Sequence, residues 1–252
     1  GMEAARVSAL RGHQVILFEK SYGLGGKLKY SSQRILKTAD RQLIHWYETQ
    51  LENLTVEIRL DEPATPEKIA AINPEIVFIA QGSEARTLTF PGMDSEKVTN
   101  AIDVLTDKTF VGPRCPAIRG GLAGCEAALH LAMHRHKMII VDSAPEILAA
   151  GIPMAPTNQQ MLKDLLVFYR SEMITSAQLK AVTEEGAVIE KNGQERLLPA
   201  HHVMIAVGFE PTNSLYEELK NDYPQVYNIG DSQAIKNIRA AIWAANEVAR
   251  TI

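Results

Sequence analysis

The sequence has few cysteines, few aromatic residues and only short apolar runs. Cys115 and Cys125 are the only cysteines among 252 residues. Two thiols cannot supply the four thiolates of an iron–sulfur cluster, and their spacing is not that of a C-x-x-C motif. Apolar runs such as VILF at 15–18 and MIIV at 138–141 have the length of strands. They are too short to cross a membrane, so we expect no membrane span.

The charge balance is nearly even, which removes another group of functions. The net charge is −4, from 26 basic and 30 acidic residues, so there is no electrostatic case for binding nucleic acid or an anionic membrane. No charged and apolar leader with a cleavage site is present, so we expect a cytoplasmic protein. The apolar fraction of 46% is that of an ordinary globular protein. The length predicts two domains.

What the chain does contain is an internal repeat. The segment GMEAARVSALRGHQVILFEK at 1–20 recurs 123 positions later as GCEAALHLAMHRHKMIIVDS. Both copies place an acid 18 residues after the first glycine, Glu19 in one and Asp142 in the other. The identical positions are Gly1, Glu3, Ala4, Ala5, Ala9, His13 and Ile16, which match Gly124, Glu126, Ala127, Ala128, Ala132, His136 and Ile139.

A second pair of segments extends the repeat over a whole unit. VFIAQGSEA at 77–85 is echoed by VMIAVGFEP at 203–211, with Gly82 and Gly208 in register. Strands alternating with helices predict an α/β protein with parallel sheets covered on both faces, built from two Rossmann-like units. An alternating stretch at 173–199 predicts a meander that turns at Asn192-Gly193. Helices are expected at 2–11, 38–56, 66–72, 158–170 and from about 238 to the end.

The second copy has the order strand, glycine turn and helix, which is suited to binding an anion. Unpaired backbone N–H groups at a helix N-terminus face a pyrophosphate, and glycines let the backbone approach it. This reasoning assigns Gly120, Gly121 and Gly124 to the loop, and Asp142 to the adenosine ribose. Because an acid repels a 2′-phosphate, Asp142 favours NADH over NADPH. The alternative is that Gly124 only permits close packing of helix and strand.

Two residues depart from the ideal pattern of this copy. Arg119 occupies the place of the first fingerprint glycine, and Pro116 lies inside the expected strand, where it removes one donor. Either Arg119 points outward and adds positive charge near a phosphate, or dinucleotide binding at this loop has decayed. Both alternatives stay open at this point, because the sequence does not show the backbone angles.

The first copy begins at its glycine. Because no residue precedes Gly1 in this sequence, we expect the first unit to lack its first strand and the loop that follows it. In a Rossmann unit that strand is central, and its neighbours then have unpaired edges. We therefore predict weak or no FAD binding by the chain on its own.

The chain resembles the C-terminal half of the NADH:flavin oxidoreductases related to 2,4-dienoyl-CoA reductase and trimethylamine dehydrogenase. The resemblance covers nearly the whole chain and implies that this half binds FAD and NAD(P)H. It also implies a separate N-terminal barrel that carries FMN and an iron–sulfur centre. The segments that carry it are GMEAARVSALRGHQVILFEKSYGLGGKL, FIAQGSEARTLTFPGMD, GGLAGCEAALHLA, AVGFEPTNSL and YNIGD.

The resemblance also assigns residues and domains. It implies that Glu19 lies on the adenosine ribose of FAD and that Asp231, after Gly230, lies on the ribityl chain. Residues 1–104 would begin the FAD-binding domain, 105–205 would form an inserted NAD(P)-binding domain, and 206–252 would close the first. The remaining residues expected at the cofactors are Gly1, Lys20, Gly25, Gly26, Lys27, Leu28, Gly82 and Gly208.

Several of these residues have a structural alternative. Asp231 precedes a helix and could simply cap it, and Gly25-Gly26 could be an ordinary turn. Gln81 and Val207 stand in the middle of segments that read A-T-G in the family. His134 and His136 lie two apart on a helix, where side chains diverge, so we expect no metal site. Cys125 lies in a first helical turn, which favours a thiolate, but no partner base is nearby in sequence.

Two functions therefore stand against each other. In the first, nicotinamide passes hydride to FAD, and electrons leave toward an FMN and iron–sulfur barrel. Hydride transfer of this kind needs no acid, base or nucleophile from the protein, so we predict no catalytic residue. In the second, the chain is a nucleotide-binding remnant or partner subunit without catalysis of its own. The sequence leaves a homodimer open.

Overall fold

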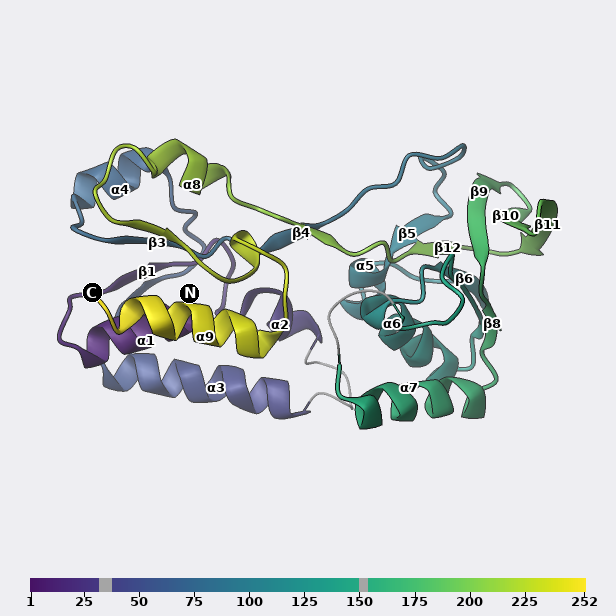
Figure 1. Cartoon of the computed structure of the whole chain (residues 1–252), viewed down its shortest axis with the longest axis horizontal. Coiled ribbons are helices and arrows are strands. Elements are labelled where there is room, and N and C mark those ends of the chain that lie inside the picture. Colours follow the sequence, from purple (N-terminus) through teal and green to yellow (C-terminus); the bar gives the residue numbers. More distant parts are fainter. Residues whose placement is uncertain (32–37, 150–153) are drawn as a thin grey trace. The chain divides into compact units, whose positions relative to one another are not determined.

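The computed structural model describes residues 1–31, 38–149 and 154–252, which form two compact units. Unit 1 comprises Gly1–Glu84 and Phe209–Ile252, and unit 2 is the inserted segment Ala85–Gly208 (Figure 1). The junctions thus lie after residues 84 and 208, whereas the sequence placed them after 104 and 205. The segment 85–104 falls in unit 2 because its strand pairs with the sheet of that unit.

Unit 2 is built on a five-stranded parallel sheet. The strand order is β5-β12-β6-β7-β8, so β6 is the central strand. Three further strands form an antiparallel sheet in the order β11-β10-β9. The elements in chain order are β5 (Val98–Asn100), α5 (Ala101–Leu105), β6 (Arg114–Ile118), α6 (Leu122–Met133), β7 (Lys137–Val141), α7 (Pro156–Phe168), β8 (Glu172–Ile174), β9 (Ala177–Thr183), β10 (Gly186–Lys191), β11 (Gln194–Pro199) and β12 (Val203–Ile205).

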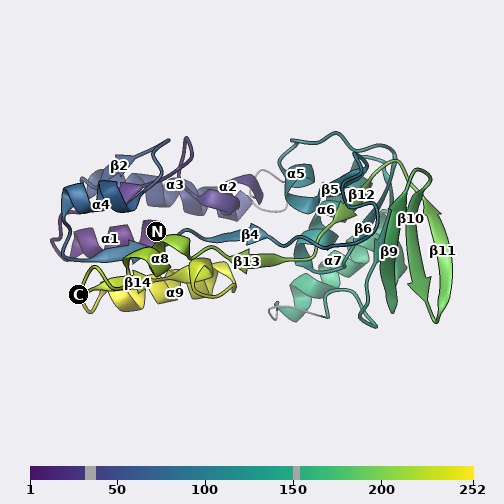
Figure 2. The ribbon, with the colours of Figure 1, turned by 90° about the horizontal axis from the view of Figure 1, so that it is seen from above.

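Different layers cover the two faces of this sheet. On one face, apolar residues of α5, α6 and α7 pack on alternate positions of β6 and β7, such as Ala117 and Ile140. On the other face, Ile118 and Val141 meet the apolar side of β9–β11, which stands beside the sheet in Figure 2. The sheet is covered on both faces, as expected. One cover is a meander because its sequence alternates with a period of two.

Pro116 lies in β6, as the sequence predicted, without disrupting the sheet. It pairs with Ile139 of β7. The ladder to β12 involves Ala117 and Ile118, so it begins after the proline. A residue that cannot donate is tolerated there because the ladder on that side starts beyond it.

Unit 1 contains two separate parallel pairs, β1 with β2 and β14 with β3. A short pair of β4 (Ser83–Ala85) and β13 (Phe209–Pro211) joins the chain segments at the junctions. The other elements are α1 (Met2–Leu10), β1 (Ile16–Phe18), α2 (Gly26–Ser31), α3 (Thr38–Asn53), β2 (Glu57–Arg59), α4 (Pro66–Ile72), β3 (Val77–Ile79), α8 (Ser214–Leu219), β14 (Val226–Asn228), η2 (Gly230–Ser232) and α9 (Ile238–Ala249).

The pairs of unit 1 correspond to the outer strands of unit 2. The pair β14-β3 corresponds to β5-β12, and the pair β1-β2 corresponds to β7-β8. Within the described residues, no strand takes the place that β6 holds in unit 2. Gly1 corresponds to Gly124 at the start of α6, and a Cβ added to it would be 3.7 Å from both Ala80 Cβ and Leu17 Cδ1.

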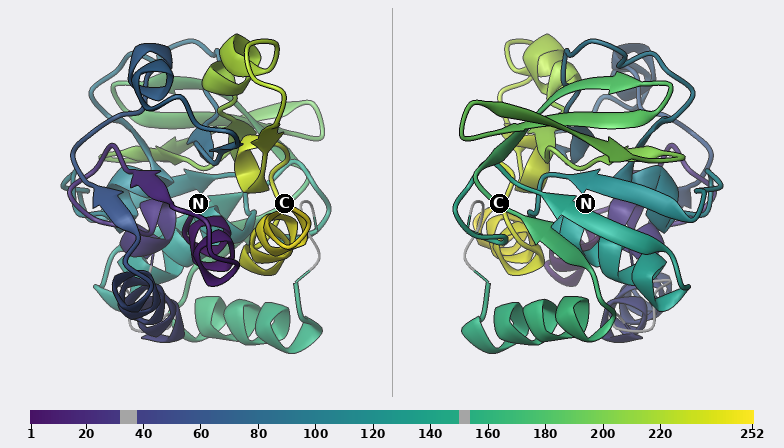
Figure 3. Two further views of the ribbon diagram at one scale, coloured as in Figure 1. Left: turned by 90° about the vertical axis from the view of Figure 1, so that its left-hand side faces the viewer. Right: turned by 90° about the vertical axis from the view of Figure 1, so that its right-hand side faces the viewer.

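Helices pack on both faces of the strands in unit 1. Along α1, the small residues Ala4 and Ala5 are buried, and the helix lies beside α9 and α3 (Figure 3). On the other face, α4 and α8 bury Ile69 and Leu215 against β3. The close approach of α1 is possible because the alanines add little bulk.

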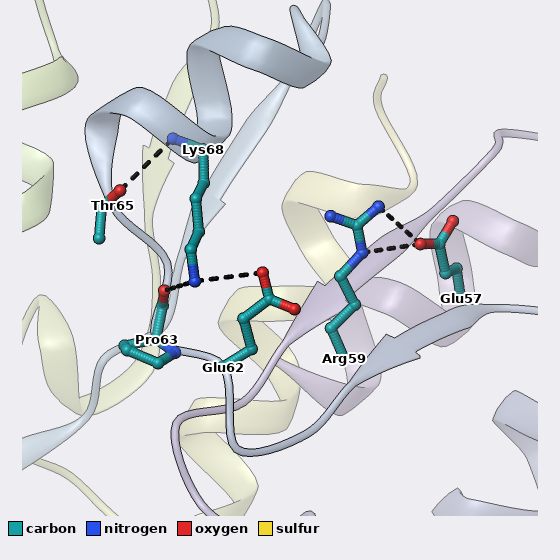
Figure 4. Close-up of polar contacts among 6 residues, drawn as sticks. All are labelled: Glu57, Arg59, Glu62, Pro63, Thr65 and Lys68. Atoms are coloured by element: carbon teal, nitrogen blue, oxygen red, sulfur yellow. Dashed lines mark hydrogen bonds and ion pairs between the residues drawn. The ribbon is translucent and has the colours of Figure 1, made fainter.

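The connection from β2 to α4 is closed by polar contacts at the surface (Figure 4). Arg59 Nε donates to Glu57 Oε1 at 2.7 Å. Lys68 Nζ contacts Glu62 Oε1 and the Pro63 carbonyl oxygen, both at 3.1 Å. Thr65 caps α4, and Pro66 follows at the first helical position, where its missing N–H costs nothing. These side chains fix where α4 begins.

Candidate functional site

The loop between β6 and α6 joins strand and helix through a glycine turn, as the sequence predicted, and its binding of phosphate stays a prediction. Arg119 adopts φ of 80°, in the left-handed region. A Cβ on Gly120 would lie 2.7 Å from Ile147 Cγ2, and one on Gly124 would lie 2.2 Å from the Arg119 carbonyl oxygen. Neither position has room for a side chain. Gly124 thus allows the loop to lie directly on the first turn of the helix.

Asp142 ties the end of β7 to this loop. Gly120 N donates to Asp142 Oδ2 at 2.6 Å, and Ala144 N donates to Oδ1 at 2.8 Å. The Asp142 side chain is 6% exposed. A carboxylate offers about four lone-pair sites, so two acceptor sites remain for hydroxyl groups. The ribose contact of Asp142 stays a prediction, and its contact with the loop is one that the sequence did not reveal.

The N-terminus of α6 leaves backbone donors available. Gly121 is the N-cap and provides no side-chain cap, and the first turn of α6 holds no acidic residue. The first N–H groups of a helix have no partner within the helix and carry its positive dipole end. Together with the glycines, this arrangement can accept a pyrophosphate, and these residues fit a dinucleotide.

Glu19, the acid of the first copy, makes different contacts from Asp142. Its Oε1 accepts from Ser21 N at 2.9 Å and from Ser21 Oγ at 2.7 Å. Its backbone N donates to the Arg59 carbonyl oxygen at 2.9 Å, which extends the pairing of β1 with β2. Lys20 follows as an exposed residue. The Glu19 carboxylate is therefore held by its own loop.

The expected flavin residues Gly25 to Leu28 form a tight turn into α2. Gly25 and Gly26 adopt φ of 104° and 52°. A Cβ on Gly25 would lie 2.9 Å from Ile44 Cδ1. Leu28 N donates to the Gly25 carbonyl oxygen at 3.1 Å. The pair forms a turn, and the turn directs Lys27 toward the end of β3. Whether these residues also contact the flavin stays a prediction.

Lys27 brings several predicted residues together in unit 1. Its Nζ donates to the Ser83 carbonyl oxygen, contacts Ser83 Oγ at 3.1 Å and lies 4.4 Å from the centre of the Phe209 ring. Burial lowers the pKa of Lys27, while the charges of Asp231 and Glu84 act in the opposite direction. A partly desolvated cation therefore lies near the Asp231 carboxylate.

Asp231 does not cap α9. Asn237 does so, by accepting from Ala240 N at 2.9 Å. Asp231 Oδ1 instead accepts from Lys236 N at 3.0 Å. Gly230 before it has a φ of 66°. The capping alternative is therefore wrong, and the ribityl contact stays a prediction.

Gly82 and Gly208 occupy corresponding places at the ends of β3 and β12. Both are left-handed, with φ of 77° and 89°. Their carbonyl oxygens accept from Thr212 N and Arg86 N, each at 3.0 Å. Gln81, where the family has a threonine, accepts from Leu215 N at 3.2 Å and thereby holds the start of α8. The departure from the family pattern has a structural use.

The cysteines and histidines make structural contacts. Burial raises the pKa of Cys115 and Cys125 to about 12. Cys125 Sγ donates to the Gly120 carbonyl oxygen at 3.3 Å, so desolvation outweighs the helix N-terminus that favoured a thiolate. His136 Nδ1 lies 3.0 Å from the Gly112 carbonyl oxygen. In the described part of the chain, no group of three metal-ligating side chains occurs.

One buried polar cluster was not predicted from the sequence. Glu3, 7% exposed, forms two hydrogen bonds with Arg6, at 2.8 and 2.9 Å, and accepts from Asn246 Nδ2 at 2.7 Å. It joins α1 to α9. The match of Glu3 with Glu126 in the repeat was the available signal, because a repeated acid in a small-residue helix is unusual.

Residues 1–251 match the model of the family described as pyridine nucleotide-disulphide oxidoreductase. The chain belongs to this family. Over 252 residues it is 41% identical to cinnamate reductase of Clostridium sporogenes, covering all of this chain and 38% of that protein. It is 35% identical to NADH oxidase of Thermoanaerobacter brockii, covering 99% and 39%. The chain thus spans about two fifths of these relatives.

Solved structures agree with this family assignment. A 2-naphthoyl-CoA reductase matches with a TM-score of 0.93 and 25% identity, covering 100% of this chain and 38% of that one. A thioredoxin reductase of T. acidophilum matches with a TM-score of 0.73 over 93% of its length. At 17% identity, the latter shows the fold alone. The expected α/β fold and the resemblance to flavin-dependent reductases are confirmed. Across the described ranges, no helix is long and apolar enough to span a bilayer.

Proposed function

We propose that unit 2 binds NADH and unit 1 binds FAD, within a larger flavin-dependent reductase. The cofactors would supply the chemistry: hydride from the nicotinamide to the flavin, and electrons onward to an FMN and iron–sulfur barrel. The protein supplies binding and position. The observation that carries the proposal is the loop of Gly120 and Gly121 at the uncapped N-terminus of α6.

Three features of unit 2 support NADH. A Cβ on Gly121 would meet no atom within 4 Å, so a ligand can approach the backbone closely at this position. Asp142 holds the Gly120 N–H and retains acceptor sites for ribose hydroxyls. Its negative charge disfavours the 2′-phosphate of NADPH.

For FAD, the support is the grouping of Lys27, Ser83 and Asp231 at the ends of β3 and β14. Open α/β sheets bind ligands outside the carboxyl ends of their strands. The Lys27 ammonium can donate to a ligand, and Asp231 can accept from hydroxyl groups. Glu19, at the end of β1, would accept from the adenosine ribose with acceptor sites that Ser21 leaves unused.

The test is titration of the purified chain with NADH and with NADPH, followed by nicotinamide fluorescence. We expect NADH to bind more tightly. Equal affinities would contradict the role of Asp142, and the absence of binding would contradict the function of unit 2.

A second candidate is a nucleotide-binding chain that holds FAD weakly or not at all by itself. It is favoured by unit 1, where no described strand lies between β1 and β3. The measurement is the flavin content after gel filtration. A colourless chain is expected, and a yellow chain with stoichiometric flavin would rule this candidate out.

A further inference from the structure

We propose that Arg119 is a phosphate-binding residue, whose guanidinium contacts the pyrophosphate of the dinucleotide at the loop of Gly120 and Gly121. This inference rests on the proposed function, namely that unit 2 binds NADH. It resolves the open question of whether an arginine in the place of a glycine assists or obstructs the site.

The backbone at Arg119 is the first observation. Its φ of 80° is one that residues with a Cβ seldom adopt. Glycine would hold this conformation without strain. Ten non-glycine residues of the described chain have a positive φ, and Arg119 has the largest value among them. Backbone strain of this kind gathers at binding sites, so a use for the Arg119 side chain would explain why it is borne here.

The charge of Arg119 is the second observation. The side chain is exposed, and it forms no ion pair or hydrogen bond with any residue in the described ranges. Asp142, at the end of β7, accepts hydrogen bonds from Gly120 N and Ala144 N with its two oxygens. The first turn of α6 adds no acid. The Arg119 guanidinium therefore has no ion-pair partner among the described residues.

The position of Arg119 fits a phosphate at the helix. Its Cα lies two residues from Gly121, the N-cap of α6, and so at most about 7.6 Å from the Gly121 Cα. An arginine side chain spans such a distance. Its planar fork can then donate two hydrogen bonds to phosphate oxygens that also accept from the helix N–H groups.

The decisive variant is Arg119→Gln. It removes the charge but keeps a side chain in the left-handed conformation, so that the loop bears the same strain. We expect NADH and ADP, which share the pyrophosphate, each to bind about tenfold more weakly. The affinity is also expected to depend less on salt concentration, because one charge interaction that salt screens has been removed. Arg119→Lys retains the charge without the fork and is expected to lie between.

The matched control is Arg114→Gln, the same change at the opposite end of β6. Arg114 is likewise exposed, and we expect its substitution to leave the affinity and the salt dependence unchanged. Circular dichroism of each variant establishes that the fold is retained. Arg119→Gly relieves the strain, so we expect a higher Tm together with weaker NADH binding.

The outcomes separate this inference from the function beneath it. If wild-type chain binds NADH and Arg119→Gln binds it equally well, the inference is overturned while the function stands. Tighter binding by Arg119→Gly overturns it too, since Arg119 would then obstruct the loop. A wild-type chain that binds neither NADH nor ADP overturns both.

Discussion

In the two copies of the repeat, residues at corresponding positions make different contacts. In unit 2, Asp142 reaches back to Gly120 and ties the glycine loop to the next strand. In unit 1, Glu19 accepts from Ser21 in its own loop. In unit 2, β6 joins the outer strands into one sheet, whereas unit 1 holds two pairs. Two acids at the same position of the repeat thus bind different partners, because their contacts depend on the segments that lie beside them.

The largest expected difference lies at the first glycine of each copy. We expect Gly124→Ala to lower the free energy of unfolding by about 3 kcal/mol, because its Cβ would lie 2.2 Å from the Arg119 carbonyl oxygen. Gly1→Ala is the matched control, since its Cβ would make ordinary contacts at 3.7 Å. Urea unfolding followed by circular dichroism measures both. Equal losses at the two glycines would contradict the comparison.

The two acids provide the next test. Asp142→Ala leaves the buried Gly120 N–H without its acceptor, and we expect a loss of about 2 kcal/mol. Glu19→Ala removes bonds only to Ser21, in a half-buried loop, and we expect less than about 1 kcal/mol. Thermal unfolding of both variants decides. An equal shift in Tm would show that Asp142 does not hold the loop.

Relief of strain should stabilise the loop of unit 2. We expect Arg119→Gly to raise the free energy of unfolding by about 1 kcal/mol, because glycine adopts the φ of 80° freely. Arg114→Gly is the contrasting change, because it places glycine in a regular strand, where it is expected to destabilise. Denaturant midpoints measure both changes. A loss of stability at position 119 would mean that the arginine side chain stabilises the loop.

The smallest effect is a difference in the acid sensitivity of the two units. Burial lowers the pKa of His202 from its usual 6.5, and the charges of His201 and Lys97 act in the same direction. In the folded state His202 Nδ1 accepts from Gly112 N at 3.0 Å, so protonation opposes folding. Because the unfolded state takes up the proton first, unit 2 loses stability as the pH falls below about 6.5.

In unit 1, the loss of stability that depends on Glu3 occurs at lower pH. Burial raises the pKa of Glu3, but hydrogen bonds from Arg6 and Asn246 outweigh it and leave the pKa below its usual 4.5. The stability from Glu3 is present above 4.5 and is lost as the pH falls through the lowered value. We expect His202→Gln to flatten the decline in stability below pH 6.5, because the variant has no imidazole to protonate. Stability measured against pH tests this, and an unchanged slope would contradict it.

Local patterns predicted much of the fold. The turn at Asn192-Gly193 lies between β10 and β11, and both residues have the positive φ that the dipeptide favours. Residues 38–56 gave the expectation of a helix, and α3 occupies Thr38–Asn53. These predictions succeed because propensity and periodicity act over a few residues.

Contacts between distant segments were not predictable in this way. Asn237 rather than Asp231 caps α9. Which of the two residues is the cap depends on where the helix begins after β14, and the sequence did not show this. The bond of Gln81 to Leu215 joins residues 134 positions apart. The first domain junction lies earlier in the structure than the sequence predicted because β5 pairs with β12. This is another contact across a long sequence separation.

The sequence by itself determined the duplicated α/β architecture, the family and the glycine positions at the loop after β6. These features could be predicted because each depends on residue types at short, fixed spacings: a repeat, a run of small residues, and an acid at a set distance from a glycine. Only the tertiary structure decided that Arg119 is left-handed, that Asp142 holds Gly120, and that Glu19 does not do the same. Backbone angles and hydrogen-bond partners depend on which strands lie side by side, and the central β6 joins its neighbours in unit 2.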